Sequence, residues 1–283
     1  MPLFTVRAEA RLKKLDRFTM RVGLPLSLAL LLAGRPLGAQ DATELGREVP
    51  KVTTVVVDYS RVGFQESLDP WQYASASIGQ RTGAGSLIGR LNFAHRFGSS
   101  GTQVEVDAYP HLTSNIYAYA SIGYSASSIF PSWRSGGELF TSLPSAWEAS
   151  LGYRQLRFGG APVTLFTAAV GKYVSNYWFS LRPYVRATTN GPSASASLTS
   201  RRYYADGDHF IGARVGYGST PPDQAPDSAS LSRTHSFSAS VQGSGDLIGR
   251  VLGTWSAGYE REELTFTTLR RSWTVSTGLR VPF

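Results

Sequence analysis

The sequence contains no cysteine, so a disulfide framework is excluded as a source of stability. After its first forty positions it also has no apolar run of the roughly 18 residues that a membrane-spanning helix needs. Lysine is scarce there as well, because only Lys51 and Lys172 occur and every other cation is an arginine. A water-facing polar surface normally carries many lysines. The absences therefore disfavour a helical membrane protein, a disulfide scaffold and an ordinary soluble β-sandwich.

The start of the sequence has the features of a secretory signal peptide. From Met20 it has a charged beginning, an apolar stretch and a small-residue exit at residues 37–39. We therefore expect residues 1–39 to be a cleaved signal peptide, with Met20 as the true start if residues 1–19 are over-called. Residues 40–50 would then form a short periplasmic N-terminal tail.

The expected leader also accounts for most of the positive charge. It contains seven basic and two acidic side chains, so its removal lowers the formal net charge from +8 to +3. The high isoelectric point is therefore largely a property of the leader, and we expect no nucleic-acid partner. Nothing in the composition asks for a cofactor.

What the chain does contain is alternation. Nearly every segment after residue 50 alternates apolar and polar residues with a period of two, and turn signals recur between the segments. We count fourteen such segments, or twelve if two short hairpins are misjudged, and find no helical pattern. The sequence predicts an all-β protein, an antiparallel transmembrane β-barrel over residues 51–283.

The lengths of the connections support this prediction. Three of the connections after odd-numbered segments are long, "RVGFQESLDP", "SASSIFPSW" and "STPPDQAPDSAS", whereas those after even-numbered segments are short, such as "TGAG" and "VSN". Long loops outside and tight turns in the periplasm are typical of outer-membrane barrels.

The polar face should line the lumen of such a barrel. It carries arginines at mid-strand, with Glu105, Asp107, Glu138 and Glu148 as available partners. Two interpretations stay open: a basic constriction for anionic solutes, or a salt-bridged network that fills the lumen. The candidate lumen residues are Arg90, Glu148, Arg154, Arg182, Tyr184, Arg186, Arg201, Tyr203 and Arg214.

The apolar face should meet lipid. Aromatic residues near strand ends form the interfacial girdles of outer-membrane barrels, and the candidates here are Trp71, Trp147, Tyr177, Trp273 and Phe283. The final segment has one apolar face and ends on a bare aromatic, which resembles the signal read by the outer-membrane assembly machinery. That predicted signal comprises Trp273, Val275, Leu279, Val281 and Phe283.

Several runs resemble one family. "EASLGYRQLRF", "GKYVSNYWFSLRPYV" and "SRRYYADGDHFIGARVGYG", with the segment ahead of them, are similar to the YaiO family of outer-membrane β-barrel proteins over essentially the whole of residues 51–283. The resemblance implies an outer-membrane location and says little about activity. Related domains occur near surface-polysaccharide functions, which makes a polysaccharide one candidate partner.

The sequence therefore leaves three functions to compare. The favoured one is a porin-like conduit for surface polysaccharide or anionic solutes, and the alternative is a non-conducting structural or docking barrel. A rim enzyme built on His235 and Ser236 is the weakest, because neighbouring strand residues point to opposite faces. We expect no catalytic site and no metal site, since "ADGD" at 205–208 lacks the further ligands of a calcium loop. Outer-membrane lipids, lipopolysaccharide and the assembly machinery are the expected partners.

Overall fold

In the computed structural model the described residues are 52–160, 162–188, 191–204, 206–219, 234–264 and 268–283. They form fourteen strands and one short 3-10 turn, η2 (Pro144–Ala146). The strands are β1 Val52–Phe64, β2 Trp71–Thr82, β3 Gly85–Arg96, β4 Ser99–Pro110, β5 Ile116–Tyr124, β6 Trp133–Leu143, β7 Trp147–Arg157, β8 Val163–Val174, β9 Tyr177–Thr188, β10 Gly191–Tyr203, β11 Phe210–Gly218, β12 His235–Ile248, β13 Val251–Glu263 and β14 Leu269–Pro282.

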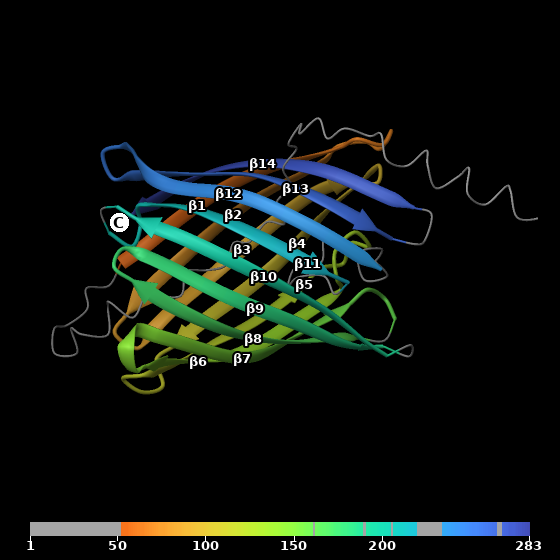
Figure 1. The fold of residues 1–283 in the computed structure, drawn as a ribbon. Helices are drawn as coiled ribbons and strands as arrows, with labels where there is room; N and C mark the ends of the chain where they lie inside the picture. The colour runs from red at the N-terminus through yellow and green to blue at the C-terminus, as the bar shows by residue number, and fades with distance from the viewer. Residues whose placement is uncertain (1–51, 161, 189–190, 205, 220–233, 265–267) are drawn as a thin grey trace, which may run out of the picture.

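Each strand pairs antiparallel with its sequence neighbours, and β14 closes the barrel on β1 (Figure 1). The closing register runs from Thr54 opposite Pro282 to Phe64 opposite Ser272. Beyond it, Phe283 N donates to Thr53 O at 2.7 Å, so the terminal residue is tied to the first strand. Closure removes the open edges that could not be tolerated in hydrocarbon. The prediction of a fourteen-stranded antiparallel barrel is confirmed.

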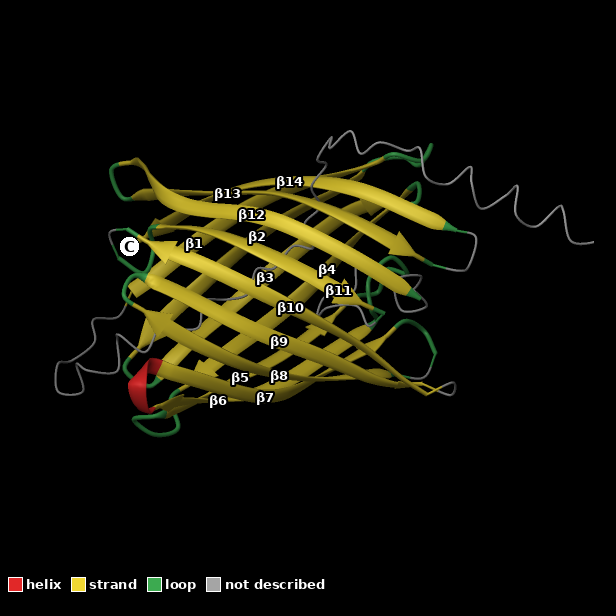
Figure 2. Cartoon of the chain, in the orientation of Figure 1, coloured by secondary structure: helices red, strands yellow, loops and turns green. Residues whose placement is uncertain are grey.

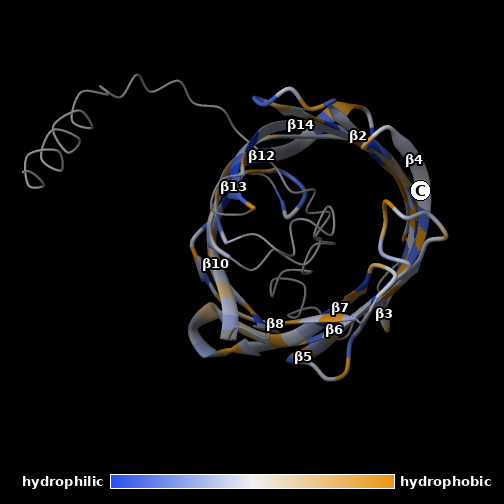
Figure 3. Cartoon of the chain, turned by 90° about the vertical axis from the view of Figure 1, so that its right-hand side faces the viewer, coloured by the Kyte–Doolittle hydropathy of each residue, from blue (hydrophilic) through white to orange (hydrophobic). Residues whose placement is uncertain are grey.

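The period-two pattern of the sequence becomes an inside and an outside. Outward side chains are apolar and exposed, as shown by Leu91 at 51%, Leu151 at 70% and Leu181 at 53% of their surface. Inward positions carry charged residues, serine and threonine, many of them buried. Figure 3 looks along the barrel and shows this wall as a closed ring. A continuous apolar outer belt of this kind requires lipid as its solvent.

The two ends of the barrel differ in their connections. The start of β1 and the end of β14 lie at the same end of the barrel. Short turns lie there too, such as those between β8 and β9 and between β12 and β13. The turn η2, red in Figure 2, lies at the same end. The opposite end carries the longer connections, including 125–132 and the 219–234 segment, of which 220–233 lie outside the described residues. Short turns mark the periplasmic end and long loops the outer end.

The predicted signal peptide and the predicted tail at 40–50 also lie outside the described residues, and both stay predictions. Within the described part of the chain, no helix has the length and apolarity to cross a membrane.

Candidate functional site in the barrel lumen

All nine predicted lumen residues lie on inward-facing positions of their strands. Arg90, Glu148, Arg154 and Tyr184 are buried, while the other five are half-buried. Their placement follows from alternation, because each shares its strand face with small polar residues such as Ser150 and Ser180.

One ion-pair cluster joins β3, β4 and β6. Arg90 Nη1 lies 3.1 Å from Glu105 Oε2 and 3.2 Å from Asp107 Oδ2. Arg134 Nη1 lies 2.6 Å from Glu105 Oε1. Tyr119 OH donates to Asp107 Oδ1 at 3.2 Å, which extends the cluster to β5. With every carboxylate paired, these charges are compensated although they are withdrawn from water.

A second cluster is centred on Glu138 of β6, whose side chain is only 1% exposed. Arg154 Nη2 contacts its Oε2 at 2.7 Å, and Arg182 Nη1 reaches its Oε1 at 2.6 Å from β9. Ser150 Oγ donates to the same Oε1 at 2.6 Å. Arg154 also lies over the ring of Tyr119, with 4.7 Å from Cζ to the centroid. Glu138 therefore holds two arginines and links β6, β7 and β9.

Inward glycines make room for these side chains. A Cβ atom on Gly136 would lie 2.6 Å from Arg154 Cδ, and one on Gly152 would lie 2.6 Å from both Glu138 Cβ and the Gly137 carbonyl oxygen. Gly136 and Gly152 are therefore packing residues of the ion-pair network.

The wall formed by β8 to β11 is different. These four strands contain no aspartate or glutamate, while Arg182, Arg186, Arg201 and Arg214 point inward from them. The registers order these side chains along the wall. Arg201 is nearest the periplasmic end, Arg214 lies opposite Thr199, and Arg186 is nearest the outer end, opposite Ser193. We call these four residues the arginine ladder.

Three members of the ladder make no ion pair with a carboxylate in the part of the chain that the structure describes. Arg214 Nη2 donates to Ser197 Oγ at 2.9 Å. Arg201 stacks instead on aromatic rings, with Cζ 4.7 Å from the Phe210 centroid and 5.4 Å from that of Trp178. The Nε of Arg186 has no hydrogen-bond partner. The charges of Arg186, Arg201 and Arg214 are therefore not compensated by a carboxylate of the described residues.

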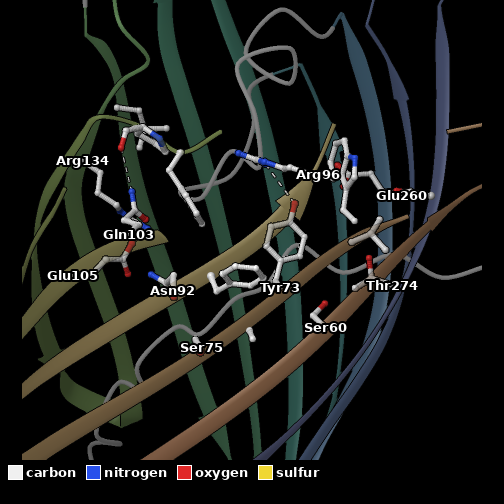
Figure 4. Close-up of a pocket in the computed structure, with 18 of the residues that line it drawn as sticks. Ser60, Tyr73, Ser75, Asn92, Arg96, Gln103, Glu105, Arg134, Glu260 and Thr274 are labelled. Atoms are coloured by element: carbon white, nitrogen blue, oxygen red, sulfur yellow. Dashed lines mark hydrogen bonds and ion pairs between the residues drawn. The ribbon is translucent and has the colours of Figure 1, made fainter. Parts of the chain in front are cut away.

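Two cavities lie along the wall of β1 to β3. We call the one nearer the outer end of the barrel the outer cavity and the one nearer the periplasmic end the inner cavity. The outer cavity has a volume of about 130 Å³, and its lining includes Trp71, Arg96 and Phe130 (Figure 4). The inner cavity has a volume of about 530 Å³ and is lined by residues that include Arg201 and the strand ends of β1 and β14. Arg90 lines both cavities, so the first ion-pair cluster stands at their junction.

The prediction that Trp71 is a membrane-interface aromatic is wrong. Its side chain is only 4% exposed and packs against the rings of Phe64 and Phe97, at 4.7 Å between centroids in each pair. Trp71 is in phase with Ser75 and Arg81 on the inward face of β2, and this phase was the available signal. The residue type suggested lipid, but the strand period places the ring inside.

The other four predicted interface aromatics point outward. Trp147, Tyr177, Trp273 and Phe283 are 43%, 39%, 44% and 70% exposed, respectively. Trp147 and Tyr177 begin strands at the periplasmic end and carry cations on their faces, Lys172 Nζ at 4.7 Å and Arg202 Cζ at 5.8 Å from the ring centroids. Val275, Leu279 and Val281 share the outward face of β14 with Trp273 and Phe283.

Some lumen residues were missed at the level of sequence. Arg270 on β14 contacts Glu262 with its Nε at 2.9 Å and lies over the ring of Trp71 at 5.0 Å. Arg96 is only 2% exposed and lies among aromatic rings, which include the ring of Trp71 that Arg270 also contacts. The inward phase of Arg96 was visible in β3, whereas the aromatic partners come from other strands and a loop.

The periplasmic turn between β10 and β11 reaches across neighbouring strands. Asp206 Oδ1 accepts from Asp208 N at 2.6 Å, and Asp208 Oδ1 lies 2.7 Å from Arg280 Nη1 on β14. His209 Nδ1 lies 2.8 Å from Asp206 Oδ1, and its Nε2 lies 3.0 Å from Asp246 Oδ2. The hydrogen bond to Asp206 and, as the second cause, the hydrogen bond to Asp246 raise the pKa of His209. The chain turns tightly at residues 206–208, as expected, and within the described residues no cluster of three or more metal-ligating side chains occurs.

The closed barrel, its apolar belt and its polar lumen define an outer-membrane β-barrel protein. The YaiO membrane beta barrel domain matches residues 52–223, and the chain belongs to this family. The outer membrane is accordingly its location. No curated protein matches the chain in sequence.

Solved structures with the same architecture are distant in sequence. A bacterial polysaccharide outer membrane secretin matches with a TM-score of 0.53 and 8% identity, covering 82% of this chain and 98% of that one. The anion-selective porin from Comamonas acidovorans matches with a TM-score of 0.46 and 10% identity, over 83% of this chain and 99% of the porin. Omp33 of Acinetobacter baumannii matches with a TM-score of 0.48 and 9% identity, over 83% and 99%. Likeness at this identity concerns the fold alone.

Proposed function

We propose that the barrel is a porin-like conduit that favours anionic solutes. The observation that carries the proposal is the arginine ladder on a wall without carboxylates. An anion passing along β8 to β11 exchanges part of its hydration for guanidinium contacts. A cation meets uncompensated positive charge at the same places.

The test is the conductance of the refolded protein in a planar bilayer, with the reversal potential measured across a potassium chloride gradient. We expect stable open conductance and a preference for chloride over potassium. Arg186→Ser and Arg214→Ser together should lower that preference, because each removes an inward charge without stranding a paired carboxylate.

The matched control is Arg202→Ser, which removes an arginine from the outward face of β10, where it contacts Tyr177. The control should keep the wild-type reversal potential. A correctly folded barrel that passes no current, or a preference that survives the double substitution, would contradict the conduit.

A non-conducting structural barrel is the second candidate, and the two ion-pair clusters favour it. Glu105 and Glu138 each hold two arginines across several strands, which stiffens one side of the lumen. If this alternative holds, the folded protein conducts no current in a bilayer. Loss of the clusters then lowers the stability of the barrel and still produces no conductance.

We also propose that the barrel is not an enzyme. Ser236 Oγ donates to the Gly218 carbonyl at 3.1 Å, while His235 on the opposite strand face lies 3.6 Å from Glu263 Oε2. Ser236 therefore cannot serve as the nucleophile of His235. Lipid hydrolysis by the wild-type protein that disappears in His235→Ala would overturn this part of the proposal.

The proposal extends to partners. Outer-membrane lipids and lipopolysaccharide would contact the apolar belt, and the assembly machinery would recognise the outward face of β14 that ends at Phe283. A polysaccharide remains a candidate solute. Phe283→Asp should lower the amount of folded protein in the outer membrane, and an unchanged amount would speak against the assembly role.

A further inference from the structure

The outer cavity holds an arginine in an unusual setting. The guanidinium Cζ of Arg96 lies 5.8 Å from the ring centroids of Trp71 and Phe130, 5.9 Å from that of Phe97 and 6.0 Å from that of Tyr73. The residue is only 2% exposed. Cation–π contacts of this kind recover part of the cost of removing a cation from water, but they do not neutralise it.

No carboxylate pairs with Arg96 within the described part of the chain. Its polar contact is a long hydrogen bond, 3.4 Å from Nη1 to Tyr73 OH, which Figure 4 draws as a dashed line. Its Nε has no hydrogen-bond partner. A buried charge without a counter-charge is costly, and functional sites are where such a cost is retained.

Two further buried groups of the same cavity are also unsatisfied. Ser60 Oγ and Arg90 Nε have no hydrogen-bond partner, and both residues line the cavity with Arg96. Three residues that line one cavity thus each hold a buried polar atom without a hydrogen-bond partner among the described residues, and such a cluster marks a candidate binding site.

The charges of the lining define what kind of molecule fits. The lining carries Arg90, Arg96, Arg134 and Arg270 against Glu105, Glu260 and Glu262. Arg90, Arg134 and Arg270 are each paired with a carboxylate, so Arg96 is the arginine of the lining without an ion pair to a described residue. A ligand with a single negative charge would pair with Arg96, whereas the second charge of a phosphate monoester would meet the glutamates of the lining.

The uncharged lining adds a second requirement. Ser75, Asn92 and Gln103 bring hydroxyl and amide groups to the lining (Figure 4). Tyr73 and Phe130 add aromatic rings to it. Sugars combine hydroxyl groups with apolar C–H faces that stack on aromatic rings. We propose that the outer cavity binds a hydroxylated monocarboxylate of the hexuronic acid type, with Arg96 pairing the carboxylate and the rings stacking on the sugar.

This site deepens the proposed conduit by naming its solute class, and its role in transport rests on that function. The binding itself is separable from conduction. It can be measured on the folded full-length protein in detergent by titration calorimetry, with glucuronate as the probe. Glucose and acetate are the comparison ligands, because glucose has the sugar ring alone and acetate the carboxylate alone.

We expect glucuronate to bind at least about tenfold more tightly than either glucose or acetate, because only glucuronate engages both Arg96 and the rings. Arg96→Gln should weaken glucuronate about tenfold or more and leave glucose unchanged. Arg96→Lys keeps the charge but loses the planar fork, so it should fall between the two. Ser60→Ala is the milder variant, with an expected loss of a few-fold.

Arg61→Gln is the matched control, because Arg61 lies on the outward face of β1 and does not line the cavity. Equal binding of glucuronate, glucose and acetate would overturn the proposal, as would undiminished glucuronate binding by both Arg96→Gln and Ser60→Ala. Anion-selective conduction without glucuronate binding refutes this site and leaves the conduit standing. Glucuronate binding by a silent barrel refutes the conduit and leaves the site standing.

Discussion

Two parts of the barrel wall use the same residue in opposite ways. From β3 to β7 the inward arginines Arg90, Arg134 and Arg154 meet carboxylates of the neighbouring strands. From β8 to β11 the strands offer no carboxylate, and Arg186, Arg201 and Arg214 lie among serine, threonine and aromatic side chains. The inward arginines of these two parts of the wall therefore differ in whether a carboxylate of the described residues compensates their charge.

The largest effect is expected when the carboxylate of Glu138, which two inward arginines share, is removed. Glu138→Gln removes the carboxylate that Arg154 and Arg182 share, and we expect the free energy of unfolding to fall by about 3 kcal/mol or more. Urea unfolding of the protein in lipid vesicles measures this.

The control for this change is Glu263→Gln at the outer rim, where the side chain is 41% exposed. Its expected loss is below about 1 kcal/mol. Equal losses for the two variants would mean that the Glu138 cluster contributes nothing special to stability.

A second contrast concerns packing beneath the charges. Gly152→Ala would press a methyl group against Glu138 Cβ and the Gly137 carbonyl oxygen, and should cost about 1–3 kcal/mol in unfolding free energy. Gly216→Ala on β11 would meet Ser238 Oγ, the end of a side chain that can rotate, and should cost less. The same urea titration tests both, and a larger loss for Gly216→Ala would contradict the packing role of Gly152.

The contrast can also be erased by giving the arginine ladder a carboxylate. Ser197→Asp places an acid where Ser197 Oγ now accepts from Arg214 at 2.9 Å. We expect the anion preference in the bilayer to fall as in Arg214→Ser, because the new carboxylate compensates the charge of Arg214. The neutral variant Ser197→Asn should keep the preference, and a loss in both variants would point to shape instead of charge.

The smallest expected effect is a pH dependence at the periplasmic rim. The pKa of His209 is raised above its ordinary value by Asp206 and Asp246. The protonated ring therefore stabilises the turn fully below pH about 6.5, and this contribution is lost as pH rises through the raised pKa. The melting temperature of His209→Gln should fall below that of the wild type at pH 5.5 and approach it at high pH. A gap independent of pH would exclude the histidine charge as the cause.

Much of the fold was predictable because strand alternation and turn signals are local. The outward Leu279 and the inward Arg280 follow from the same period of two, and the strand count follows from the turns. The prediction for Trp71 was wrong because it followed the residue type and not the alternation along the strand. Ser75 shares the alternation of Trp71 on β2 and indicates the inward face. For the binding cavity, phase alone was insufficient, since Phe130 comes from a loop between β5 and β6.

The sequence by itself determines which face of each strand is polar, because side-chain direction alternates along any strand whatever its neighbours are. It also determines that β8 to β11 carry no acid. Only the closed barrel decides which charges meet, since Glu138 on β6 reaches Arg182 on β9 across β7 and β8. Curvature and register set that distance, and neither is written in the alternation of a single strand.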